Sequence, residues 1–127
     1  LDGMDPTELT LAAFQRKVAI VRDAASSRGH VPEIGTNLLG VSITDDRAAA
    51  ARAHRDRLAA LLGHEHGLTD DDILASPYFL LGTVEEGAAV LAERRDELGL
   101  SYYYVADVVA DKMSAVIAAM RTRDDMP

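Results

Sequence analysis

The sequence predicts an α/β fold with parallel strands, on two observations. Patterns typical of helices alternate along the chain with short apolar segments, and a crossover through a helix returns the next strand in parallel. The two clearest strand segments, 33–44 and 101–106, are apolar without regular polar alternates, which is typical of strands covered on both faces. We expect one domain over residues 1–127, with two to three parallel strands and about five helices.

The first helix is expected from the Asp5 region to about residue 26. Asp5 is a suitable N-cap, and Pro6 and Glu8 suit the first turn of a helix. Apolar residues then recur at helical spacing and form one stripe: Leu11, Phe14, Val18, Val21 and Ala25. A loop over 26–32 leads into the strand at 33–44, which has the sequence EIGTNLLGVSIT.

The middle of the chain predicts two further helices. Thr44 and Asp45 are candidate caps for an alanine-rich helix over about 46–62, and Gly63 ends it. After an exposed connection, Thr69 and Asp72 have the spacing of a capping box for a short helix that ends before the proline at 77.

The last third of the chain repeats the alternation. A brief apolar run at 78–81 precedes a helix over 84–98, which begins with a capping box of Thr83 and Glu86 and ends at Gly99. Tyrosines at 102–104 then lie in the second strand, which we expect to be covered on both faces. A final helix over about 108–121 precedes a polar tail, RTRDDMP, which we expect to fray.

Three segments together resemble the luciferase-like flavin-dependent oxidoreductases, and within them the branch that uses the deazaflavin coenzyme F-420. They are FQRKVAIVRDAA at 14–25, VSITDDRAAAA at 41–51 and ASPYFLLGTVEEGAAVLAERRDELGLSYYYV at 75–105. Asp2-Gly3 is also similar to the Ala-Asp-Gly that ends the sixth barrel strand in the family. The resemblance covers most of the chain and rests on the three segments in combination.

The resemblance implies a C-terminal fragment of a (β/α)₈ TIM barrel, with 33–44 as the seventh strand and 101–106 as the eighth. A whole barrel takes roughly 250 residues, and its active site is built from loops at the C-terminal ends of many strands. The parent enzyme would pass a hydride between FMN or deazaflavin and an organic substrate, which only the complete barrel would bind. We therefore expect this chain to be inactive alone, to bind no cofactor by itself and to contain no catalytic residue. The alternative is a non-catalytic α/β module that self-associates to complete its sheet.

Three residues are candidates for contacts with the cofactor. Gly82 and Thr83 precede the 84–98 helix, whose free N–H groups could hold a phosphate, although the acidic residues in its first turn favour a capping role. Asp107 follows the last strand, where barrel enzymes place working residues, but it is also a natural N-cap.

Other polar and aromatic clusters have simpler interpretations. His64-Glu65-His66 lacks the i, i+4 spacing of helical zinc motifs, so we favour a solvated loop and assign no metal. The acidic runs at 45–46 and 70–72 suit helix caps better than a calcium loop. The tyrosines could stack on the flavin ring, but packing between the barrel interior and the outer helices is favoured.

Composition limits the partners of the chain. The 127 residues include no cysteine and carry a net charge of −8, which argues against disulfides, cysteine-bound metals and nucleic acid. No apolar stretch approaches the roughly 20 residues that cross a bilayer. We therefore expect a cytoplasmic protein that binds neither nucleic acid nor membranes. Because two or three parallel strands leave open edges, we also expect a homo-oligomer, most simply a twofold dimer that buries 102–104 or 38–43.

Overall fold

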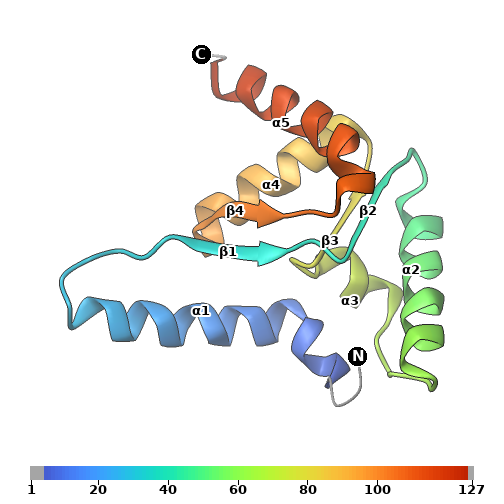
Figure 1. The fold of residues 1–127 in the computed structure, drawn as a ribbon, viewed down its shortest axis with the longest axis horizontal. Coiled ribbons are helices and arrows are strands. Elements are labelled where there is room, and N and C mark those ends of the chain that lie inside the picture. The colour runs from blue at the N-terminus through green and yellow to red at the C-terminus, as the bar shows by residue number, and fades with distance from the viewer. Residues whose placement is uncertain (1–4, 126–127) are drawn as a thin grey trace.

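The computed structural model describes residues 5–125 (Figure 1), and the suggested similarity at Asp2-Gly3 lies outside them. Within these residues the chain is an α/β protein with five α-helices and two small parallel sheets of two strands each. The helices are α1 (Leu11–Ser26), α2 (Arg47–Leu62), α3 (Asp70–Ala75), α4 (Val84–Leu98) and α5 (Ala110–Asp125). The strands are β1 (Ile34–Asn37), β2 (Gly40–Ile43), β3 (Phe79–Gly82) and β4 (Leu100–Tyr104), and two short 3₁₀ helices are η1 (Pro6–Leu9) and η2 (Asp107–Val109).

The segment predicted as one strand at 33–44 changes its pairing partner in the middle. The N–H group of Leu38 donates to the oxygen of Tyr104 at 2.9 Å, which extends the parallel β1–β4 pair. The next N–H group, of Leu39, donates to the oxygen of Tyr78 at 2.7 Å and leads into the parallel β2–β3 pair. Successive N–H groups of an extended chain point to opposite edges, so β4 and β3 lie on opposite sides of this segment.

The β2–β3 sheet is covered by helices on both faces. Side chains of β3 alternate between two cores, because successive residues of a strand point to opposite faces. Phe79 and Leu81 pack with residues of α2 and α3, whereas Leu80 packs with residues of α4 and α5. All four residues of β3 are buried. Figure 1 shows α2 and α5 on opposite sides of this sheet.

The β1–β4 pair is covered on one face only. Leu98 and Leu100 form a third core with Phe14 and Val18 of α1, which Figure 1 shows running beside β1. Tyr103 is half-buried against this core, but Tyr102 and Tyr104 are 43% and 67% exposed. The expectation that the tyrosine strand is covered on both faces is therefore wrong for this chain, because no described element lies over the second face.

A β-bulge in β4 decides which tyrosines face outward. Ile34 pairs with Leu100 and Gly35 pairs with Tyr102, so Ser101 is an extra residue on β4. The extra residue shifts the alternation by one position. Leu100 and Tyr103 consequently face the same core although they are three residues apart.

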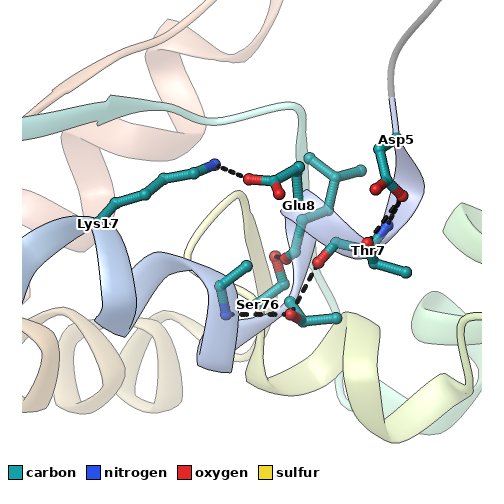
Figure 2. A network of polar contacts seen from close by, with 8 residues as sticks. Asp5, Thr7, Glu8, Lys17 and Ser76 are labelled. Carbon is teal, nitrogen blue, oxygen red and sulfur yellow. Dashed lines mark hydrogen bonds and ion pairs between the residues drawn. The ribbon is translucent and has the colours of Figure 1, made fainter.

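The first predicted helix is divided in two at Thr10. Asp5 caps η1 by accepting from the N–H of Thr7, and Thr10 caps α1 by accepting from the N–H of Ala13. Figure 2 shows the contact of Asp5 with Thr7 together with the ion pair between Lys17 and Glu8, which are 2.7 Å apart at Nζ and Oε2. Threonine is a common N-cap residue, so Thr10 is a suitable start for the helix. The proline at position 6 makes a helix start at Asp5 equally suitable from the sequence.

The same network ties the N-terminal segment to the core. The buried hydroxyl of Ser76 donates to the main-chain oxygen of Leu9, as Figure 2 shows. Further along α1 the apolar stripe is less buried than the spacing predicts, because Val21 is exposed. The helix α1 is thus held to the body mainly by its first half.

Most predicted helix ends are confirmed. Capping boxes form at Thr69 with Asp72 and at Thr83 with Glu86, and α4 spans the predicted residues. Gly63 and Gly99 end their helices in the left-handed conformation.

Two further predicted ends are wrong. The cap of α2 is Asp46, not Asp45 or Thr44, and its carboxylate accepts from the N–H of Ala49. The C-terminal tail does not fray at 121, because α5 continues to Asp125. Within residues 5–125 no helix has both the length and the apolar character to span a bilayer.

Candidate functional site

The predicted cofactor residues Gly82 and Thr83 lie where β2 and β3 end. The N–H of Thr44 donates to the oxygen of Gly82 at 2.8 Å, so the two strand ends are side by side. Gly82 has a φ of 140°, and a Cβ there would lie 3.0 Å from Cβ of Glu86. Only glycine suits this close approach to the start of α4.

The first turn of α4 is occupied by its own side chains. Thr83 Oγ1 accepts from the N–H of Glu86 at 3.1 Å, and Glu86 Oε1 accepts from the N–H of Thr83 at 2.9 Å. The bond from the Thr83 N–H is the main cause that lowers the pKa of Glu86. The helix start therefore already holds a carboxylate where an anionic ligand would bind, which favours the capping alternative.

Arg47, at the start of α2, is a neighbour that sequence reasoning missed. Its Nε donates to the oxygen of Leu81 at 3.2 Å, and its Nη1 lies 3.9 Å from Oε2 of Glu86. The guanidinium thus bridges α2 to the end of β3 and balances the charge of Glu86. The only sequence signal for it was its place just after the predicted strand end.

Asp107, the third predicted cofactor residue, is not shown to join this group. It is exposed and begins η2, whose N-cap is Ala106 without a side-chain hydrogen bond. The expectation that Asp107 is an N-cap is therefore wrong. Among the described residues no hydrogen bond or ion pair connects Asp107 with Thr83 or Gly82.

Ser42 and His54 form a polar pair between β2 and α2 that the sequence did not indicate. Ser42 Oγ and His54 Nε2 are 2.9 Å apart, and the imidazole ring lies 5.5 Å from the ring of Phe79. A Cβ on Gly40 would meet the imidazole at 2.6 Å, so glycine at this position leaves room for the ring.

The environment of His54 favours its neutral form. Burial lowers the pKa of His54, and the positive charges of Arg57 and Lys112 lower it further. A serine nucleophile with a histidine base needs a third group to orient the far ring nitrogen. Within residues 5–125 no hydrogen bond reaches Nδ1 of His54, so we assign the pair a structural role.

A buried cation lies between α4 and the strands. Arg94 is 6% exposed, and its Nη2 donates to the main-chain oxygen of Ser76 at 2.8 Å. Burial lowers the pKa of Arg94, and Tyr103 and Glu93 act in the opposite direction. Burial raises the pKa of Tyr103, which Arg94 partly offsets. The two groups are therefore close, although Nη1 of Arg94 and the hydroxyl of Tyr103 form no hydrogen bond with any described residue.

The exposed side of β1–β4 is aromatic. The rings of Tyr102 and Tyr104 meet edge to face at 5.9 Å. Tyr102 also covers Gly35 of β1, since a Cβ on that glycine would lie 2.2 Å from the tyrosine ring. Asn37 pairs with Tyr104 and is exposed beside it. This face could stack on a planar ring or pack against further strands.

The histidine motif at 64–66 is largely taken up by structural hydrogen bonds. His66 Nδ1 accepts from the N–H of Leu68 at 3.0 Å, so Nε2 carries the proton and donates to the oxygen of Arg55 at 2.9 Å. Both ring nitrogens of His66 are thus engaged. In the part of the chain that the structure describes, no group of three or more His, Asp or Glu side chains could hold a metal ion.

Comparison of the chain with protein-family models, with curated proteins and with solved structures finds no match. The resemblance to the luciferase-like oxidoreductases consequently rests on the three sequence segments alone.

Proposed function

We propose that this chain is the C-terminal portion of a luciferase-like oxidoreductase, inactive alone, whose parent passes a hydride between FMN or deazaflavin and an organic substrate. The three similar segments include β3, α4, β4 and most of β2. The parallel pairing of all four strands is the pairing that a barrel fragment requires. A chain without cysteine fits a reducing compartment, and we propose the cytoplasm.

The observation that carries the proposal is the uncovered aromatic face of β1–β4. Parallel strands are normally covered on both faces, yet here Tyr102, Tyr104 and Asn37 are exposed. In a barrel this face would turn inward and pack in layers against side chains from other strands. The exposed tyrosines would then need no other explanation.

In the parent enzyme this chain would supply few direct contacts to the cofactor. The main-chain N–H groups at Gly82 and Thr83 remain weak candidates for a phosphate, because Glu86 competes for the same helix end. Asp107 remains a weak candidate because it follows the last strand. No residue of the chain is assigned a catalytic role.

The experiment compares the 127-residue chain with the longest protein encoded in the same reading frame. We expect the longer protein to retain FMN or deazaflavin through purification, detected by absorbance and fluorescence after denaturation, and the shorter chain to retain neither. A longer protein that contains no flavin of either kind, and takes up none when it is supplied, would contradict the proposal.

A second candidate is a non-catalytic α/β module that self-associates. The helices on both faces of β2–β3 favour it, because a barrel has helices on its outer face only. The same comparison separates the two candidates: if no longer protein is encoded, the 127-residue chain is the complete unit and the barrel proposal fails.

A further inference from the structure

A groove of about 410 Å³ runs along one edge of β4. Tyr102 and Tyr103 both line it, although neighbouring residues of a strand point to opposite faces. A cavity that touches both faces lies along the edge of the strand. The opposite wall belongs to α4, through Leu91 and Arg95, and to α5, which contributes the apolar side chains of Met113, Ile117 and Met120.

The main chain of β4 is open on this side. Within the described residues β4 pairs with β1 and with no other strand. Its second edge therefore presents unpaired N–H and carbonyl groups, and such an edge is a template for another strand. An extended chain that pairs there would at the same time place side chains in the groove.

The two ends of the groove differ in their charged residues. At the start of β4 lie Arg121 and the ion pair of Arg95 with Asp124, which are 3.0 Å apart at Nη1 and Oδ2. This pair shows that α5 runs antiparallel to β4, so the other end of the groove is the start of α5. Asp107, Asp111 and Lys112 are exposed beyond that end, outside the residues that line the groove.

We propose that the open edge of β4 and its groove form a twofold interface with the same edge of a second copy, paired antiparallel. Around a twofold axis normal to the sheet, the two α5 helices run antiparallel on one face. Asp111 of the second copy then lies next to Arg121 of the first. The twofold axis repeats this contact between Asp111 of the first copy and Arg121 of the second. We place the interface at β4 and not at 38–43 because the groove lies beside β4.

This interface does not depend on the oxidoreductase function. It belongs to the 127-residue chain, whose β4 edge is open, whereas a longer protein would cover the edge with its own strands. The interface should bury roughly 1,000 Å² or more in total, as stable dimers do. Failure of the dimer leaves the barrel proposal intact, and a longer flavin-free protein leaves the dimer intact.

The first test compares two exposed isoleucines by light scattering and sedimentation at micromolar concentration. Ile117 lines the groove and is 43% exposed, whereas Ile20 on α1 is 69% exposed and lies outside it. We expect the wild type and Ile20→Lys to be dimers and Ile117→Lys to be a monomer. A wild-type monomer of 13.6 kDa at every concentration overturns the proposal. A dimer that only Ile20→Lys dissociates overturns it too, because the interface then lies on α1.

The second test exchanges the charges at the ends of the groove. Arg121→Glu and Asp111→Arg should each weaken the dimer about tenfold, because each reversal replaces two attractive contacts by two repulsive ones across the twofold axis. The double variant should regain most of the lost affinity. If both single variants weaken the dimer and the double variant weakens it further, the antiparallel arrangement is wrong.

Discussion

Arg94 of α4 reaches through the core to Ser76, where its Nη2 donates a 2.8 Å hydrogen bond to the main-chain oxygen. The hydroxyl of the same serine donates to the oxygen of Leu9. One buried serine thus connects α4 with the N-terminal 3₁₀ helix. The connection crosses elements that lie far apart in the sequence.

Removing the guanidinium should destabilise the protein. Arg94→Ala leaves the oxygen of Ser76 without its charged donor and opens a cavity, so we expect the free energy of unfolding to fall by about 2–4 kcal/mol. Arg94→Met fills the space without burying a charge and should cost less. Urea unfolding followed by circular dichroism measures both. Equal stability of Arg94→Ala and the wild type would show that the contact contributes nothing.

The stability of the protein should depend on pH through His54. Its pKa is lowered in the folded state, so folding is favoured fully above about pH 6.5, the ordinary histidine value, and less as pH falls through the folded pKa. The unfolded chain binds the proton more readily in that range. We expect the loss of stability below pH 6.5 to be smaller in His54→Gln. This variant keeps a polar partner for Ser42, and the other three histidines are unchanged. Identical pH profiles of the two proteins would rule out this role of His54.

The cap of α4 should contribute measurably to stability. Thr83→Ala removes the oxygen that accepts from the N–H of Glu86, so we expect a loss of about 0.5–2 kcal/mol in the free energy of unfolding. Thr83→Ser keeps the hydroxyl and serves as the control. If both variants lose the same amount, the methyl group of the threonine matters and the cap does not.

The isolated chain should bind neither cofactor of the parent family. Few of the groups that would surround a flavin are present, and Glu86 already occupies the start of α4. Fluorescence titration with FMN and with deazaflavin should give no saturation in the micromolar range. A dissociation constant in the low micromolar range, about −8 kcal/mol, would contradict the expectation for either cofactor.

The helices were the most predictable part of the fold because their ends depend on local chemistry. A threonine or serine hydroxyl can cap only the turn that follows it, and a glycine in the left-handed conformation ends only the turn before it. Thr83 and Gly99 therefore mark α4 correctly. At α2 three neighbouring polar residues could each serve as the cap, and the sequence does not distinguish Asp46 from Asp45.

The strands were less predictable because their partners lie far away in the sequence. Nothing local to Leu38 and Leu39 indicates that two different strands pair on either side of them. The polar contacts of Ser42, Arg47 and Arg94 also depend on tertiary placement. Their residue types are ordinary at those positions, so the sequence gives no signal that separates them from solvated side chains.

The bulge at Ser101 has a consequence for changes of chain length. Deleting this residue would leave Leu100 opposite Ile34 and the next tyrosine opposite Gly35, so the strand would become regular and every other side chain would keep its face. Inserting a residue between Tyr102 and Tyr104 would instead turn the following positions over, exposing buried groups and burying exposed ones. In a collection of single-residue insertions and deletions, loss of Ser101 should therefore be the change in this strand that folding tolerates best.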